Sequence, residues 1–208
     1  MTEAKILRAG LFVDGFNLYH AIDDLGARHL KWVNLFTLGQ KIIPQKSEQL
    51  TEVIYCSAYY PGDADKRRRH ELYIRALGHF GVTTKLGHYV HEQMGCRKCN
   101  HVWKKPTEKQ TDINLALSVV DAARSGRVDC IYLLTADTDQ AATLTYLADH
   151  FPSILRITVV PPGRPPSDDL RNRSDRTLKL QRHHIEDHLL PGFIAADPAI
   201  IRPVEYNP

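Results

Sequence analysis

Short apolar runs alternate with longer amphipathic stretches along most of the 208-residue chain. The short runs are rich in β-branched and aromatic residues, which is typical of strands, and the longer stretches repeat apolar residues at helical spacing. The predicted strands are 9–13, 52–60, 82–90, 130–134 and 155–160, and the predicted helices are 15–25, 33–43, 64–80, 111–125 and 138–149. Parallel strands need crossover connections that bury both sheet faces, so this alternation predicts an α/β fold.

The domain organisation follows from the same pattern, which no repeat or low-complexity linker interrupts. We expect one α/β domain over residues 1–165, with a polar, cysteine-bearing excursion at 91–106, and a C-terminal extension over 166–208 that packs on it. In the helix 111–125 the apolar residues at i, i+3, i+4 and i+7 are Ile113, Ala116, Leu117 and Val120. We expect this face of the helix to pack against the core.

Composition excludes several classes of protein. At 43% hydrophobic and 25% charged residues, the chain is typical of a folded globular protein and not of a disordered one. No apolar run approaches the ~20 residues that cross a bilayer, and the N-terminus shows no secretory pattern, so we expect a cytoplasmic protein without a membrane partner. The four cysteines are then more naturally thiols or metal ligands than disulfides. The oligomeric state stays open, with a homodimer as one alternative.

Acidic residues stand where predicted strands end. Three of them follow strands, and a fourth begins the helix after the polar excursion; they are Asp14, Asp112, Asp137 and Asp139. Ligands of parallel sheets bind beyond the carboxyl ends of the strands, so we expect these side chains to line one rim. An aspartate at such a place also caps helices, and for Asp14 alone capping is the simpler interpretation.

A cluster of carboxylates has a chemical consequence. Like charges within a few ångströms repel each other unless a proton or a cation neutralises them. An all-oxygen set of ligands suits Mg²⁺ or Mn²⁺ better than zinc. Such ions activate a bound water and offset charge on a phosphate, so the pattern predicts phosphodiester hydrolysis.

Four segments together carry a resemblance to a known family. They are FVDGFNLYH, EKQTDINLALSVV, YLLTADTDQAATL and ITVVPPGR, in that order. They resemble the NYN domain family, PIN-like ribonucleases of the bacterial uncharacterised type, and the resemblance covers roughly Lys5 to Leu190. It implies a three-layer α/β/α fold of the PIN-like type, on a parallel sheet, and metal-dependent endoribonuclease activity.

The resemblance also implies roles for single residues. The catalytic set it carries over is Asp14, Asn17, Asp112, Asp137 and Asp139, and the four aspartates would hold Mg²⁺ or Mn²⁺. Asn17 would position Asp14 or a bound water, and Thr135 would fill the small hydroxyl position before the acids.

Two positions depart from the family pattern. Ser118 stands where many members have another aspartate, and Gln140 stands where a large apolar residue is common. Glu108, upstream of Asp112, could compensate for the missing acid, although a solvated loop residue is the simpler interpretation. A catalytically weak RNA-binding module of the same fold, or a nuclease acting on DNA, therefore remains an alternative.

Basic residues supply a second line of argument for a nucleic-acid partner. The candidate phosphate-binding residues are Lys66, Arg67, Arg68 and Arg69, at the start of a predicted helix, and Arg164, after the last predicted strand. Contacts of this kind position a phosphate backbone without reading its sequence. The alternative is a solvated helix face, the usual meaning of a charge run. Tyr19, Tyr59 and Tyr60 offer stacking surfaces for unpaired bases.

The polar excursion contains one CxxC motif with nearby histidines. The potential ligands of a structural Zn²⁺ are Cys96, Cys99, His88, His91 and His101. Two thiolates and two imidazoles make a tetrahedral zinc site, but a single CxxC is a weaker signal than two. The histidines could equally face solvent from a hairpin.

Overall fold

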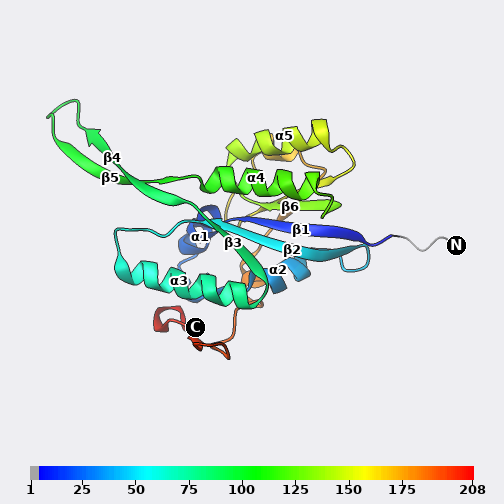
Figure 1. Ribbon diagram of the computed structural model, residues 1–208, viewed down its shortest axis with the longest axis horizontal. Helices are drawn as coiled ribbons and strands as arrows, with labels where there is room; N and C mark the ends of the chain where they lie inside the picture. The colour runs from blue at the N-terminus through cyan, green and yellow to red at the C-terminus, as the bar shows by residue number, and fades with distance from the viewer. Residues whose placement is uncertain (1–4) are drawn as a thin grey trace.

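The computed structural model describes residues 5–208 and shows a parallel sheet between two layers of helices (Figure 1). The six strands of the sheet are β1 (Leu7–Asp14), β2 (Glu48–Ser57), β3 (Val82–Leu86), β6 (Cys130–Leu134), β7 (Leu155–Val160) and β8 (Arg176–Lys179). Their order is β3-β2-β1-β6-β7-β8, and every neighbouring pair is parallel. The predicted three-layer α/β/α fold is therefore confirmed.

The helices divide between the two faces of the sheet. The elements are α1 (Gly15–Asp24), α2 (Leu35–Ile42), α3 (Ala64–His79), α4 (Thr111–Arg124), α5 (Ala141–His150), α6 (Asp168–Asn172) and α7 (Arg182–Glu186). Helices α1, α2, α3 and α7 contribute to one core cluster, and α4, α5 and α6 contribute to the other. Successive side chains of a strand point to opposite faces, so Leu11 and Val13 enter the first core while Phe12 enters the second.

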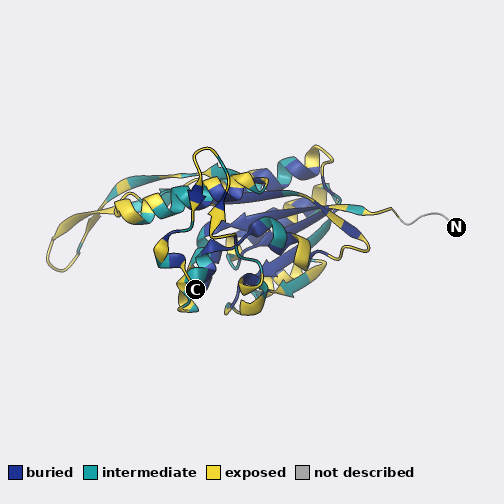
Figure 2. Cartoon of the chain, turned by 90° about the horizontal axis from the view of Figure 1, so that it is seen from below, coloured by how far each residue is buried: buried dark blue, intermediate teal, exposed yellow. Residues whose placement is uncertain are grey.

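The segment predicted as one strand over 82–90 is in fact two elements. The chain leaves the main sheet after Leu86 and forms an antiparallel hairpin of β4 (His88–Gly95) and β5 (Val102–Lys109). This hairpin projects away from the body of the molecule, on the side of the sheet where α3 and α4 begin (Figures 1 and 2). It contains the whole cysteine-bearing excursion predicted at 91–106.

The chain beyond residue 165 adds to the sheet before it crosses the α3 side of the molecule. Strand β8 pairs with β7, so the sheet extends past the boundary predicted at 165. The remaining elements include a short ladder of β9 (Phe193–Ile194) and β10 (Ile200–Ile201) and a 3-10 turn, η3 (Val204–Tyr206). Tyr206 is buried and packs against Trp32, in the 3-10 turn η1 (Arg28–Trp32), with ring centroids 6.4 Å apart.

The predicted core face of α4 is wrong. Ile113 and Leu117 are 61% and 60% exposed, whereas Leu115, Val119 and Ala122 are fully buried against the sheet. Both stripes have helical spacing, and periodicity alone does not say which one meets the sheet.

No helix within residues 5–208 has both the length and the apolar character that crossing a bilayer requires.

Candidate functional site

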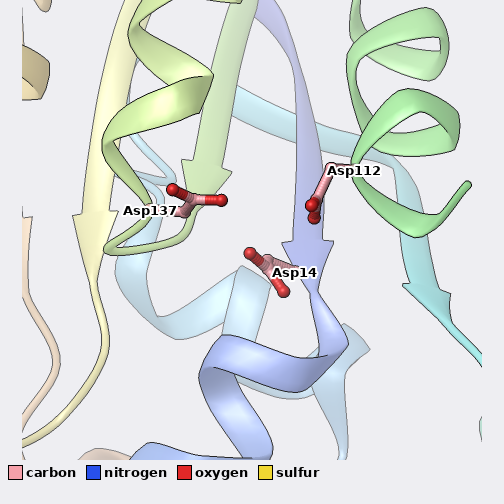
Figure 3. A group of neighbouring side chains, drawn as sticks. All are labelled: Asp14, Asp112 and Asp137. Carbon is pink, nitrogen blue, oxygen red and sulfur yellow. The ribbon is translucent and has the colours of Figure 1, made fainter. Parts of the chain in front are cut away.

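Three aspartates meet at the carboxyl edge of the sheet (Figure 3). Asp14 is the last residue of β1, Asp137 follows β6, and Asp112 is the second residue of α4. One carboxylate oxygen from each lies within 4.8 Å of those of the other two. Among residues 5–208, this is the one group of His, Cys, Asp or Glu side chains found with such spacing. The neighbouring strands β1 and β6 bring Asp14 and Asp137 together, although 123 positions separate them in the chain.

Asp14 owes its position to the abrupt turn from β1 into α1. Its carboxylate accepts the backbone N–H of Asn17 at 3.0 Å and so caps α1. A Cβ at Gly15 would lie 2.5 Å from the carbonyl oxygen of Cys56 on β2, so the turn has no room for a side chain there. Asp14 therefore both caps α1 and belongs to the acidic group.

Hydrogen bonds fix the buried Asp14 carboxylate against the end of β6. It accepts from Nδ2 of Asn17 at 2.6 Å and from the hydroxyl of Thr135 at 2.9 Å. The Thr135 hydroxyl in turn accepts the backbone N–H of Asp137 at 3.0 Å, and Oδ1 of Asn17 accepts that of Ala136 at 3.3 Å. The two strand ends are thereby held in one arrangement, with Asn17 and Thr135 as the links.

Asp112 is placed by contacts to the backbone of α4. Glu108 accepts the N–H of Thr111 at 2.8 Å and also its hydroxyl, so it satisfies a free donor at the start of the helix. Gln140, in the 3-10 turn η2 (Thr138–Gln140), donates from Nε2 to the carbonyl oxygen of Asp112 at 3.3 Å. Gln140 is itself buried, so this departure from the family pattern serves as a polar link between η2 and α4.

The electrostatics of the group favour a bound cation. Burial raises the pKa of Asp14, and the hydrogen bonds from Asn17 and Thr135 oppose that rise. Partial desolvation, followed by the charges of Asp14 and Asp137, raises the pKa of Asp112 to about 6. The charges of Asp14 and Asp137 oppose the ionisation of Asp112, and a divalent ion would relieve this repulsion. The donors are all oxygens, so they fit Mg²⁺ or Mn²⁺.

Two residues singled out from the sequence lie outside this group. Asp139 is exposed in η2, where its backbone N–H donates to the Asp137 carboxylate at 3.0 Å. Ser118 is fully buried in the core between α4 and the sheet and donates to the carbonyl oxygen of Asn114 at 2.5 Å. Three of the four expected carboxylates therefore come together, and the position of the missing family acid lies in the core.

A pocket of about 540 Å³ opens beside the acids. Asp14, Asp112 and Asp137 form part of its lining, and the aromatic side chains of its lining are Phe16, Tyr19, Tyr55, Tyr60, Tyr73, Tyr89 and Tyr206. The rings of Tyr60 and Tyr89 meet edge to face at 5.6 Å. Tyr19 and Tyr60 were expected as stacking surfaces, but Phe16 and Tyr89 were not, because only the fold brings β4 next to α1.

Polar groups in the pocket differ in charge. The Lys66 ammonium lies over the rings of Tyr19 and Tyr60, 4.9 and 5.3 Å from their centroids. Burial, together with the nearby charge of Lys66, lowers the pKa of His70 to about 4. The imidazole is therefore neutral at physiological pH, and the cations that line the pocket are Lys31, Lys66 and Lys105.

The predicted phosphate-binding residues do not form one surface. Lys66 lines the pocket, but Arg67, Arg68 and Arg69 pair with Glu71 at 2.8 Å, Asp65 at 3.8 Å and Glu205 at 3.0 Å. Arg164 pairs with Asp24 at 2.7 Å. These four arginines have acidic partners, so their charge is less available to a phosphate than the sequence suggests.

The candidate ligands of the predicted tetrahedral zinc site lie in two places along the hairpin. Cys96, Cys99 and His101 lie at the tip of the hairpin, where the Cys96 N–H donates to the His101 carbonyl at 2.8 Å. His88 and His91 lie eight and five positions earlier along β4. At a rise of ~3.3 Å per residue they are about 26 and 16 Å from Cys96, too far for one tetrahedral centre. The expectation that His88 and His91 complete a zinc site is wrong.

The chain resembles known proteins in both sequence and fold. The family model of the NYN domain matches residues 8–181. The chain is 26% identical over 230 residues to 6-hydroxy-3-succinoylpyridine 3-monooxygenase of Pseudomonas putida, covering 93% of this chain and 70% of that protein. A crystal structure of a Vibrio parahaemolyticus protein of unknown function superposes with a TM-score of 0.57 at 16% identity, covering 91% of this chain and 99% of that one. That likeness concerns the fold alone.

Proposed function

Because the chain belongs to the NYN domain family, we propose that it is a metal-dependent endoribonuclease that hydrolyses phosphodiester bonds of single-stranded RNA. The observation that carries the proposal is the group of Asp14, Asp112 and Asp137, whose oxygens lie within 4.8 Å of one another. The group belongs to three separate chain segments, and burial and mutual repulsion raise the pKa of Asp112 to about 6.

The chain's own residues would prepare the site for Mg²⁺ or Mn²⁺. Asp14, Asp112 and Asp137 would hold the ion, which when bound lowers the pKa of a coordinated water and offsets charge on the phosphate. Asn17 and Thr135 keep the Asp14 carboxylate oriented through hydrogen bonds of 2.6 and 2.9 Å. Asp139 would act from the edge of the group, through its backbone contact with Asp137.

The pocket supports a single-stranded substrate. A base within a duplex is covered by its neighbours, whereas an unpaired base can enter an aromatic pocket and stack there. Phe16, Tyr60 and Tyr89 supply such surfaces next to the acids. The Lys66 ammonium on the same wall would hold an adjacent phosphate.

Cleavage of a labelled single-stranded RNA in the presence of Mn²⁺ tests the proposal. Wild-type protein and the control Asp149→Asn, an exposed α5 residue outside the pocket, should cleave equally. Asp112→Asn and Asp137→Asn should lose at least 100-fold in rate, on the scale of removing a charge-stabilising group. Equal cleavage by all four proteins would refute the assignment. Binding without cleavage under any divalent ion would favour the RNA-binding alternative, and equal cleavage of a matched DNA would widen the substrate to DNA.

A second candidate function is oxygenation of a small N-heterocycle. It is favoured by the 540 Å³ aromatic pocket, a size typical of small-molecule sites, and by the name of the Pseudomonas putida relative. A monooxygenase places one atom of O₂ in its substrate and reduces the other to water with two electrons from a donor. Incubation with 6-hydroxy-3-succinoylpyridine, O₂ and a reduced nicotinamide, followed by mass spectrometry, tests this. An oxygenated pyridine would establish this function, and unchanged substrate without binding would exclude that compound.

A further inference from the structure

The β4–β5 hairpin begins at the pocket and ends far from it. Tyr89 and Lys105 to Glu108 line the pocket near its base, and the two strands then project away from the body (Figures 1 and 2). Each strand has eight residues, which gives an arm of about 25 Å. No residue from His88 to Lys109 is buried. Such an arm adds little to the core, so its stability contribution does not explain it.

The arm has an excess of positive charge that has no internal partner. Its cations are Arg97, Lys98, Lys104, Lys105 and Lys109, against the acids Glu92 and Glu108. This excess of three equals the net charge of +3 of the whole chain. Lys109 pairs with Glu92 at 2.7 Å, but within residues 5–208 the other four cations form no ion pair. In contrast, Arg67, Arg68 and Arg69 of α3 have acidic partners.

Exposed rings lie among these cations near the tip. Trp103 is 42% exposed, and its ring stacks with that of His101 at 6.0 Å between centroids and 15° between planes. Met94, directly opposite Trp103 across the hairpin, is 37% exposed. The arm thus exposes apolar and aromatic side chains beside its cations. Aromatic rings between cations are the combination that binds stacked bases and their phosphates.

We propose that the β4–β5 hairpin is an arm that binds single-stranded RNA and guides it toward the acidic group. The inference rests on the proposed function, since RNA is the substrate there. The arm and the pocket are continuous, because Lys105, Pro106 and Thr107 belong to the hairpin and also line the pocket. A polyanion would meet positive charge from the tip to the acids, and the metal would neutralise the acids at the end of that path.

Binding of a fluorescent 20-nucleotide RNA, measured by anisotropy in EDTA so that no cleavage occurs, tests the arm. The arm variant combines Arg97→Ala, Lys98→Ala and Lys104→Ala, and its matched control combines Arg28→Ala, Lys41→Ala and Lys46→Ala, exposed cations outside the hairpin. The arm variant should bind at least tenfold more weakly. Loss of three phosphate contacts should also reduce the slope of log affinity against log salt by about 2. Trp103→Ala should weaken binding on the order of tenfold through lost stacking.

Hydrolysis of a small diester separates the arm from the acidic group. Bis(4-nitrophenyl) phosphate needs only the acids, so the arm variant should hydrolyse it at the wild-type rate while its KM for the 20-nucleotide RNA rises at least tenfold. If the arm variant binds RNA as tightly as the wild type, and the wild type cleaves RNA, the proposal for the arm is refuted and the proposed nuclease activity is not. If the arm variant keeps its RNA affinity but loses a dimer that the wild type forms in size-exclusion chromatography, the arm is instead a contact between two copies of the chain. A wild-type protein that neither binds nor cleaves RNA would overturn both proposals.

Discussion

Asp112→Asn is expected to stabilise the metal-free protein at neutral pH, because it removes one of three neighbouring negative charges. The pKa of Asp112 rises from an ordinary value of 3.8 to about 6, which corresponds to about 3 kcal/mol if the whole shift is taken at face value. The side chain is exposed, so screening reduces this to about 1.5 kcal/mol. Loss of a negative charge in the first turn of α4 costs about 0.5 kcal/mol. A net gain of about 1 kcal/mol remains.

Urea unfolding with EDTA, at several pH values, measures this gain as the difference between variant and wild type. Ionised Asp112 destabilises the folded state, since its folded pKa is raised, so the gain should be full at pH 8. As the pH falls through 6 toward 4, the carboxyl takes up a proton in the folded and then in the unfolded state, and the gain should vanish. Titrating groups remote from the site cancel in the difference. Salt at 0.5 M should shrink the gain as well.

Divalent ion should reverse the order of stability. At 100 times its dissociation constant, Mn²⁺ adds about 2.7 kcal/mol to a protein that binds it, and Asp112→Asn should forfeit most of this. The control Asp149→Asn should follow the wild type in every condition. Two outcomes would refute the reasoning: a variant less stable than wild type at pH 8 in EDTA, or an equal response of both to Mn²⁺.

Two further substitutions and one pH titration test neighbouring parts of the site. Gln140→Leu should alter the free energy of unfolding by less than about 1 kcal/mol but weaken Mn²⁺ binding several-fold, because Asp112 loses a link to its backbone carbonyl; calorimetric titration measures this. Ser118→Asp should cost about 3 kcal/mol in urea unfolding, since the position is fully buried. The His70 ring, with its pKa lowered to about 4, should stay neutral in NMR spectra from pH 8 to 5.5, and its contribution to stability should fall from pH 6.5 toward 4 as the unfolded chain takes up protons.

The meeting of Asp14, Asp112 and Asp137 was predictable because it depends on local rules. A buried strand that ends in an acid places that acid at the carboxyl edge, and parallel neighbours share this edge. The rule does not say how many residues past the strand end an acid can lie and still join the group. Asp139, only two residues past Asp137, lies in η2 outside the group. Resemblance to the family did not resolve this, because its motif includes both aspartates.

What the sequence did not reveal are contacts between distant parts of the chain. Arg69 pairs with Glu205 and Arg164 with Asp24, acids 136 and 140 positions away, and no local pattern announces such partners. The sequence placed His88 and His91 near Cys96, whereas an extended strand separates His88 from Cys96. The face of α4 was misjudged because Ile113 and Leu117 form a second apolar stripe beside the true core stripe.

The arm bears on the choice between the two candidate functions. The acids and the aromatic pocket fit a phosphodiester or a small heterocycle alike, since both need a polar group beside a stacking surface. A small substrate enters the pocket without touching Arg97 or Lys98 at the hairpin tip, so it gives those charges no role. A polymer with a charge at every phosphate gives a role to every cation along the arm. The distribution of charge, more than the acidic group itself, therefore favours RNA over a small molecule as the substrate.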